Sequence, residues 1–268
     1  MRSSTLAWRK YPAVTRITLK NSFAYVGDFL VRTVFLVIIL YIFMQLWSAT
    51  YAGEGEATIA GYSFSDMVWY LIVTEAITLA LPSLSSMVEQ DVKSGDVAYR
   101  LTKPMHYVGY YFAWYNADVG LKLGINLLVG GALGLLVFGV PDFGYGWLAF
   151  PVAAVGAIAV NFLLNMIVAL CAFWVEETTG LEFVYKKLLF TVGGMLMPLG
   201  MFPGWLQEIC GWLPFQAVLY FPAHTVTSFD ASKLLGMLAV QWGWIVLLGF
   251  VVLWMYGRGV KKLHVNGG

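Results

Sequence analysis

The sequence has few charged residues for its length. Only 12% of its 268 residues are Asp, Glu, Lys or Arg, whereas soluble domains average about 25%. Hydrophobic residues make up 60% of the chain, and its mean hydropathy is +0.74. This balance excludes an ordinary soluble protein and indicates an integral membrane protein.

Motifs for chemistry are also missing. The sequence has no G-x-x-x-x-G-K-[ST] phosphate loop, no HExxH or CxxC metal motif and no GxSxG nucleophile motif. Its three histidines are scattered, and Cys171 and Cys210 are expected to be packed, inert thiols. We therefore expect a chain that is not an enzyme and that carries no metal, no cofactor and no nucleic acid.

Long apolar runs are present, and a membrane-spanning helix needs about 20 such residues. The runs are continuous and do not alternate as barrel strands would, so they predict helices. We expect one all-α membrane domain over residues 1–268 with six transmembrane helices. Their ranges are about 29–49, 67–88, 119–140 (or from 107), 147–174, 181–201 and 234–256.

The cations are distributed unevenly between these segments. Fifteen of the 16 Lys and Arg residues fall on one side of the membrane, and Lys233 alone falls on the other. The positive-inside rule then predicts a multi-pass protein of the cytoplasmic membrane with both termini in the cytoplasm. The N-terminal stretch lacks an unbroken apolar core, so we expect no cleavable signal peptide.

Residues 5–27 are predicted to form an amphipathic helix along the inner leaflet. It serves either as a plain anchor or as a helix that also touches a partner. Basic side chains gather on one side and mostly apolar or hydroxyl-bearing ones on the other: Arg9, Arg16 and Lys20 against Tyr11, Val14, Thr18 and Tyr25.

A polar stretch, VEQDVKSGDVAYRLTKPM, separates the second and third segments at residues 88–105. It predicts a short cytoplasmic helix over residues 94–104, capped by Ser94 and ended by Pro104. A helix of this length is unstable alone, so it must lie against something else.

The side chains of that short helix suggest what it meets. Asp96 and Arg100 are four residues apart and are expected to pair. Val97 and Leu101 share one face, which is predicted to dock in a groove of a soluble partner, with a position on the membrane surface as the alternative.

The stretch at residues 195–230 is apolar but is interrupted by several prolines and glycines, so one regular helix cannot run through it. We expect short helices at about Trp205–Trp212 and Pro214–Phe229, within a re-entrant external region over residues 203–229. Irregular backbone at this depth must be covered by protein or water.

Glu75 is the one acid deep inside a predicted span. A carboxylate there should face the bundle interior, a partner or water. It is either a polar contact on a transport pathway or a packing contact, with Arg32 as its candidate partner. Arg32 can instead extend its charge to the inner surface.

Three stretches together resemble the ABC type 2 exporter permeases, most of all the daunorubicin-exporter-like branch of small six-helix permeases. The first is SGDVAYRLTKPM, in which Gly95, Val97, Leu101, Lys103 and Pro104 match the family pattern. The second is FWVEETTGLEFVYKKLLF, which is followed by Gly-Gly and Pro. The third is MPLGMFPGWLQEICGWLPFQAVLYFPAHTV. Its matching positions are Pro198, Leu199, Phe202, Pro203, Trp205, Leu206, Leu213, Pro214, Phe215 and Pro222.

The resemblance implies a transport subunit that works with a separate nucleotide-binding ATPase, which holds ATP and Mg, and with a second permease of the same or a related chain. It implies an external lid formed by Pro203, Trp205, Trp212, Pro214, Phe215 and Pro222. It also implies that the short cytoplasmic helix couples to the ATPase through Ser94, Gly95, Asp96, Val97, Arg100, Leu101, Lys103 and Pro104.

The expected function is therefore export of an amphipathic, lipid-like or glycan-type cargo by alternating access. Two alternatives stay open from the sequence: the substrate-binding membrane subunit of a vitamin importer, and a small secondary transporter. The first would bind a vitamin directly, and the second would show ion coupling without an ATPase.

Overall fold

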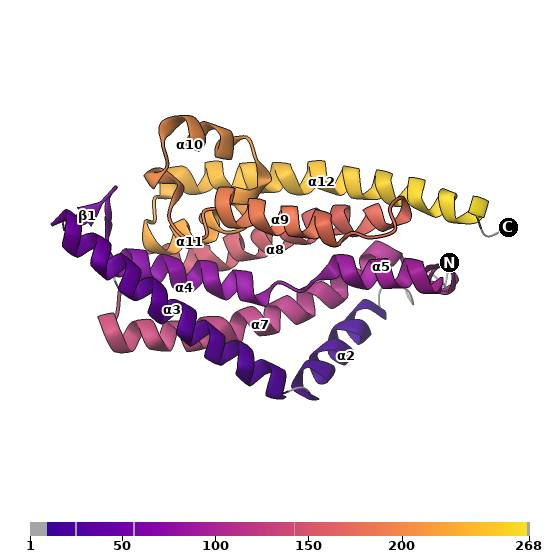
Figure 1. Ribbon diagram of the computed structural model, residues 1–268, viewed down its shortest axis with the longest axis horizontal. Helices are drawn as coiled ribbons and strands as arrows, with labels where there is room; N and C mark the ends of the chain where they lie inside the picture. Colours follow the sequence, from indigo (N-terminus) through magenta and orange to yellow (C-terminus); the bar gives the residue numbers. More distant parts are fainter. Residues whose placement is uncertain (1–9, 25, 56, 142, 267–268) are drawn as a thin grey trace.

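The computed structural model describes residues 10–24, 26–55, 57–141 and 143–266. Its long helices run roughly along one axis and form one elongated bundle (Figure 1). The elements are α2 Lys10–Ala24, α3 Val26–Glu54, β1 Thr58–Ile59, β2 Tyr62–Ser63, α4 Phe64–Ala80, α5 Leu84–Ser94, α6 Asp96–Leu101, α7 Tyr107–Phe138, α8 Gly146–Leu170, η1 Cys171–Phe173, α9 Thr179–Val192, η2 Leu199–Met201, α10 Gly204–Gly211, η3 Pro214–Ala217, α11 Tyr220–Thr227 and α12 Ala231–Asn266.

Five stretches of the described chain are long and apolar enough to cross a membrane, which confirms an all-helical membrane protein. The predicted segment 181–201 begins as α9, but that helix ends at Val192 after 14 residues. At 1.5 Å per residue it rises about 21 Å, short of the roughly 30 Å hydrocarbon core. The chain then turns at Gly194, which has a φ of 76°. The count of six spanning helices is therefore not confirmed.

The second predicted segment, 67–88, is divided between two helices. α4 ends at Ala80 and α5 starts at Leu84. Leu81, just before Pro82, is extended with a ψ of 121°, because a following proline disfavours the helical conformation. α5 therefore continues α4 after a break, and most of it lies beyond the predicted end of the span.

One end of the bundle carries short elements. The strands β1 and β2 pair antiparallel around Ala60 and Gly61, which both have positive φ angles. Ser63 then starts α4 with a reciprocal capping box, since its Oγ accepts the N–H of Asp66 and the Asp66 carboxylate accepts the N–H of Ser63. This closes the connection from α3 to α4 tightly.

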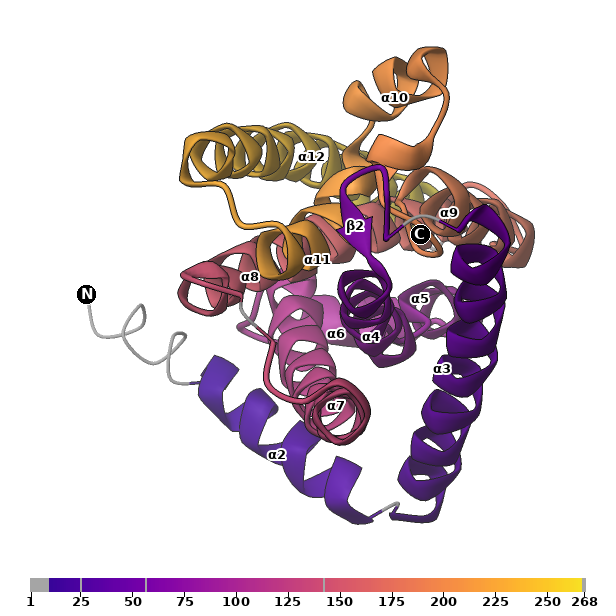
Figure 2. The same ribbon diagram turned by 90° about the vertical axis from the view of Figure 1, so that its left-hand side faces the viewer.

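The core surrounds α4, whose residues are mostly buried. Figure 2, which views the bundle along its long axis, places α4 inside and α3 at the edge. α3 exposes apolar side chains such as Val31 and Phe35, and α7 exposes Leu128 and Leu136. Exposed apolar faces of this kind suit contact with lipid.

α12 is tied to the rest of the bundle by one buried amide. Gln241 is fully buried, and its Nε2 donates to the carbonyl oxygens of Ala153 in α8 and Ala217 in η3, at 3.0 and 2.9 Å. A buried amide without such partners would cost about 1–3 kcal/mol. The two hydrogen bonds therefore add to the packing of α12 against α8, although Oε1 of the same amide has no hydrogen-bond partner among the described residues.

α2 lies obliquely across the first turns of α7 (Figure 1). Arg16 and Lys20 are exposed and Thr18 is buried, but the apolar Ile17 is exposed too, so the amphipathic interface helix stays a prediction. The helices approach closely, since a Cβ on Gly109 would lie 2.9 Å from the hydroxyl of Tyr11. Residues 5–9 and 25 of the predicted helix lie outside the described residues.

Candidate coupling site

α5 and α6 meet in a sharp elbow at one end of the bundle. Gly95 joins them with a φ of 78°, a left-handed conformation that favours glycine. α6 spans only Asp96–Leu101, so the predicted helix over residues 94–104 is shorter than expected and starts later. The predicted cap by Ser94 is wrong, because Ser94 is the last residue of α5 and Gly95 holds the cap position.

A buried carboxylate holds the elbow in shape. Asp91 of α5 is 6% exposed, and its Oδ2 accepts hydrogen bonds from the hydroxyls of Tyr107 and Tyr111 at 3.0 and 2.6 Å. The Nε of Arg100 lies 2.8 Å from the same oxygen. Arg100 thus pairs with Asp91 and not with Asp96 as the spacing suggested.

Sequence reasoning missed the role of Asp91. Its partners lie nine, 16 and 20 residues away, beyond the spacing of a single helix face. The guanidinium of Arg100 also lies over the rings of Tyr110 and Tyr111, 5.1 and 5.6 Å from their centroids. A cluster of tyrosines following Pro104 was the signal available in the sequence.

The apolar face of α6 turns inward. Val97 is 1% exposed and belongs to the hydrophobic core, and Leu101 is half-buried against it. Val97 is therefore not available to a partner, because the bundle covers it, whereas docking by the half-buried Leu101 stays a prediction. Both side chains stabilise the elbow itself.

The outer surface of the elbow is polar with one exposed aromatic ring. Tyr99 is 66% exposed, and the Nζ of Lys103 lies 4.5 Å from its ring centroid. Ser94, Asp96 and Pro104 are exposed beside it. We call this surface, formed by Ser94–Asp96, Tyr99, Lys103 and Pro104, the elbow tip. Tyr99 was not in the predicted coupling set; the other residues of the elbow tip belong to that set and are exposed.

Polar contacts also join α5 to the start of α9. The N–H and hydroxyl of Thr178 both donate to Oε2 of Glu89 at 2.7 Å. The hydroxyls of Ser83 and Ser85 donate to the two carboxylate oxygens of Glu182, which is itself buried. These hydrogen bonds therefore link the α4–α5 break and α5 directly to α9.

Inside the bundle a second polar network joins α7, α8 and α9. The hydroxyl of Tyr115 donates to Oδ1 of Asn161, whose Nδ2 donates to the hydroxyl of Tyr185 at 2.8 Å. Asn165 donates to Oδ1 of Asn161 at 2.7 Å. Sequence reasoning missed this network, since its residues lie on three predicted spans.

Glu75 is 1% exposed and belongs to α4. Its Oε1 has no hydrogen-bond partner among the residues that the structure describes. The predicted contact with Arg32 is not confirmed and stays a prediction. Arg32 instead lines two cavities, one beside α2 and one against α4 and α9.

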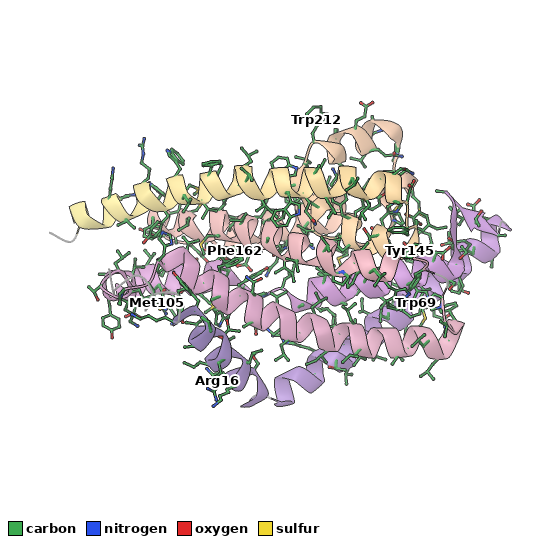
Figure 3. The ribbon with its side chains drawn as sticks, turned by 180° about the vertical axis from the view of Figure 1, so that it is seen from behind. Arg16, Trp69, Met105, Tyr145, Phe162 and Trp212 are labelled. Carbon is green, nitrogen blue, oxygen red and sulfur yellow. The ribbon has the colours of Figure 1, made fainter. Side chains whose placement is uncertain are left out.

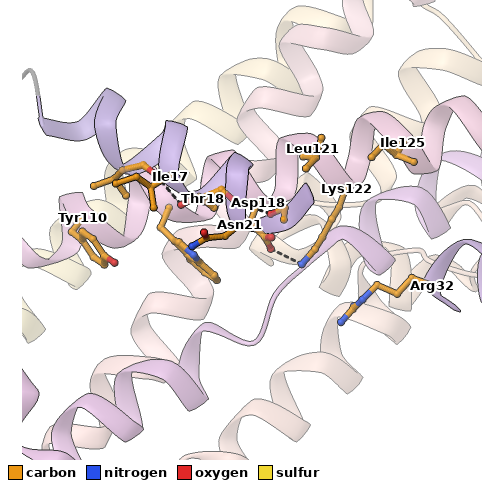
Figure 4. A pocket seen from close by; sticks show the side chains of 12 residues that line it. Ile17, Thr18, Asn21, Arg32, Tyr110, Asp118, Leu121, Lys122 and Ile125 are labelled. Carbon is orange, nitrogen blue, oxygen red and sulfur yellow. Dashed lines mark hydrogen bonds and ion pairs between the residues drawn. The ribbon is translucent and has the colours of Figure 1, made fainter. Parts of the chain in front are cut away.

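The cavity beside α2 is shown in Figure 4 and has a volume of about 460 Å³. It lies between α2, α3 and α7. Its polar lining includes Asn21 and an ion pair in which Nζ of Lys122 is 2.6 Å from Oδ2 of Asp118. Lys122 and Arg32 extend from different helices toward the same opening.

The predicted lid residues lie away from the elbow. Figure 3 places Met105, just after α6, and Tyr145, just before α8, at opposite ends of the bundle, with Trp212 on the outside. Trp205 and Trp212 of the α10 region are 66% and 84% exposed. The remaining members of the set divide by burial: Pro214, Phe215 and Pro222 are buried, and Pro203 is exposed.

A second feature of that end is a half-buried histidine. The hydroxyl of Tyr62 and Nδ1 of His224 are 2.7 Å apart, and the ring of His224 stacks on Tyr220. Burial and the charge of Lys233 lower the pKa of His224 to about 4. His224 is therefore neutral at physiological pH.

Among the described residues, no group of three or more His, Cys, Asp or Glu side chains is placed to hold a metal ion. The fold and the elbow define a helical membrane protein. At one end it presents a polar surface, the elbow tip, which the contacts of Asp91 hold to the bundle. Residues 35–267 match the family model described as ABC-2 family transporter protein. The chain therefore belongs to the ABC-2 transporter family, as its sequence motifs indicated. The comparison with curated proteins found no match to the sequence.

Proposed function

We propose that the chain is the permease subunit of an ATP-driven exporter and that the elbow tip receives the motion of a separate ATPase. The observation that carries the proposal is the elbow itself. It exposes Tyr99 and Lys103, while the pair of buried Asp91 with half-buried Arg100 and the inward-facing Val97 keep it rigid. A rigid projection transmits a push, whereas a flexible loop absorbs it.

The proposed orientation places the elbow tip in the cytoplasm. α3 begins part-way along the bundle, and the elbow and the C-terminal turns of α12 project past that point (Figure 1). Lys93, Arg100 and Lys103 lie in this projecting part, and cytoplasmic segments are rich in such cations. Both termini are then cytoplasmic, and α10 and α11 face the exterior as a lid.

The internal contacts offer a route for the motion. ATP binding in the partner would displace α6, and the Asp91–Arg100 pair would carry the displacement to α5. Glu89 and Glu182 would then pass it to α9 through Thr178 and Ser85. Such a shift of packed helices can exchange inward-facing and outward-facing states.

The proposed assembly contains two permease chains and two ATPases, with ATP and Mg held by the ATPases. Membership of the ABC-2 family favours it over the vitamin-importer subunit and the secondary transporter. We propose an amphipathic, lipid-like or glycan-type cargo, because the cavity bordered by Arg32 combines apolar side chains with Tyr185, Lys186 and Lys187.

The test is co-purification of the chain with a phosphate-loop ATPase encoded beside it, followed by measurement of ATP hydrolysis. The wild-type chain should bind this ATPase and change its rate. The double variant Tyr99→Ala, Lys103→Ala should lose binding by tenfold or more, about 1.4 kcal/mol, and Trp205→Ala at the other end should keep it. Absence of any ATPase partner, or equal binding by all three proteins, would contradict the proposal.

A further inference from the structure

A second groove lies on the other side of α2 from the cavity of Figure 4. It has a volume of about 1020 Å³ and is bounded by α2 and by the first turns of α7. Its walls are largely apolar, with Leu19 from α2 and Phe112, Ala113 and Ala117 from α7. We call it the α2–α7 groove. Its size is at the upper end of the roughly 300–1,000 Å³ of ligand pockets.

Two cationic side chains border this groove, and no acidic side chain lines it. Arg16 and Lys20 line it, are exposed and lie four residues apart on one face of α2. No Asp or Glu occurs in α2 or in the lining of the groove. The cavity of Figure 4 differs, because there Lys122 is paired with Asp118.

The groove lies at a suitable depth for a lipid headgroup. α2 precedes α3 and crosses the bundle where that span begins (Figure 1), and Figure 3 shows Arg16 on the outer side of α2. A cation at the start of a span meets the headgroup layer, and apolar walls that continue along α7 meet the acyl chains.

We propose that the α2–α7 groove binds one anionic phospholipid, with its phosphate between Arg16 and Lys20 and an acyl chain along Phe112, Ala113 and Ala117. Charge complementarity favours this occupant. A helix from a second copy of the chain would need to bring carboxylates to both cations, or bury them unpaired at high cost. The groove and its cations do not depend on the proposed function. Only the expectation that this lipid lies in the cytoplasmic leaflet, which is rich in anionic lipids, rests on it.

The test measures lipid retention on the purified full-length chain. Native mass spectrometry counts the molecules of phosphatidylglycerol or phosphatidylcholine that remain bound, and a phosphatidylglycerol with a photoreactive acyl chain maps the contact. Wild-type protein should retain phosphatidylglycerol in preference to phosphatidylcholine and crosslink within residues 107–120. The double variant Arg16→Glu, Lys20→Glu should lose about tenfold in retention, because each cation near an anionic headgroup adds several-fold in affinity.

Matched variants serve as controls, and one further variant blocks the groove. Lys261→Glu with Lys262→Glu makes the same charge change on exposed residues of α12, and Arg16→Lys with Lys20→Arg keeps the charge, so both should retain the lipid. Ala113→Trp fills the groove and should remove the acyl crosslink. Gly120→Trp adds the same ring at an open position of α7 and should leave the crosslink. If the charge reversal prevents folding, Arg16→Gln with Lys20→Gln gives the same comparison.

Equal retention of the two lipids by wild-type protein, or equal loss in the α12 control, would overturn the proposal. A crosslink of the photoreactive lipid only outside residues 107–120 would do the same. The measurement involves no ATPase and no transport. Its failure would therefore leave the coupling role of the elbow standing, and failure of the coupling role would leave the lipid site standing.

Discussion

The Nε of Arg100 lies 2.8 Å from Oδ2 of Asp91, so the end of α6 is bonded back to α5 across the turn at Gly95. Asp91 is buried and Arg100 is half-buried. The pair makes the two helices one rigid body. A force on α6 must then move α5, and this relationship underlies the predicted coupling.

Asp91→Asn should destabilise the elbow. It removes the charge that pairs with Arg100 and accepts the two tyrosine hydroxyls. Breaking a fully buried pair costs about 3–5 kcal/mol, and the partial exposure of Arg100 reduces this to about 2 kcal/mol. Chemical unfolding of the purified chain measures the loss. Asp96→Asn is the control, because it changes an exposed acid one helical turn from Arg100 in α6. An equal loss of stability in that variant would refute the role given to Asp91.

Gly95→Ala should also weaken the elbow, because Gly95 has a φ of 78° and nothing within 4 Å would crowd a methyl group. The cost is therefore one of backbone conformation, about 1–2 kcal/mol. Gly120→Ala is the control, since that glycine lies in α7 with open space and an ordinary φ. It should be neutral or slightly stabilising. Thermal unfolding compares them, and similar midpoints would count against the elbow geometry.

Ser85→Ala should loosen the joint between α5 and α9. Ser85 is fully buried and donates to the buried carboxylate of Glu182. Loss of a hydrogen bond to a charged group costs about 1.5–3 kcal/mol. Ser86 is exposed and donates only to the carbonyl oxygen of Ser83, so Ser86→Ala should change the unfolding free energy by less than about 0.5 kcal/mol. The prediction fails if the two variants unfold alike.

The free energy of unfolding should decrease as the pH is lowered, because of His224 in α11. Its pKa is lowered to about 4 in the folded chain, whereas the unfolded value is about 6.5. Between these values the unfolded state binds a proton that the folded state does not, so stability decreases as pH falls from 6.5 to 4, by up to about 3 kcal/mol. His224→Gln should flatten this part of the pH profile of Tm. An unchanged profile in the variant would show that other groups dominate.

Much of the fold follows from local sequence patterns. Long apolar runs located α3 and α8 within about five residues, because about 20 apolar residues suffice to predict a span. α7 starts at the alternative position, residue 107, and α12 continues past the predicted end at residue 256 as far as Asn266. The break at Pro203 likewise located α10, since proline interrupts helices for a local steric reason. The helix predicted over Pro214–Phe229 is divided into η3 and α11.

Contacts between distant segments could not be predicted in this way. The pairing of Arg100 with Asp91 depends on a left-handed Gly95, and nothing in the spacing favours it over Asp96. The burial of Val97 depends on where the bundle ends relative to α6. Local periodicity identifies an apolar face but does not say which partner covers it.

The central claim is that the elbow tip contacts an ATPase in the cytoplasm, and site-specific photocrosslinking tests it most directly. A photoreactive amino acid replaces Tyr99, which is 66% exposed, or Trp212, which is 84% exposed at the other end. With the neighbouring ATPase co-expressed, the account predicts an adduct to that ATPase from position 99 and none from position 212. An adduct from position 212, or labelling of position 99 by a membrane-impermeant reagent added outside intact cells, would contradict it.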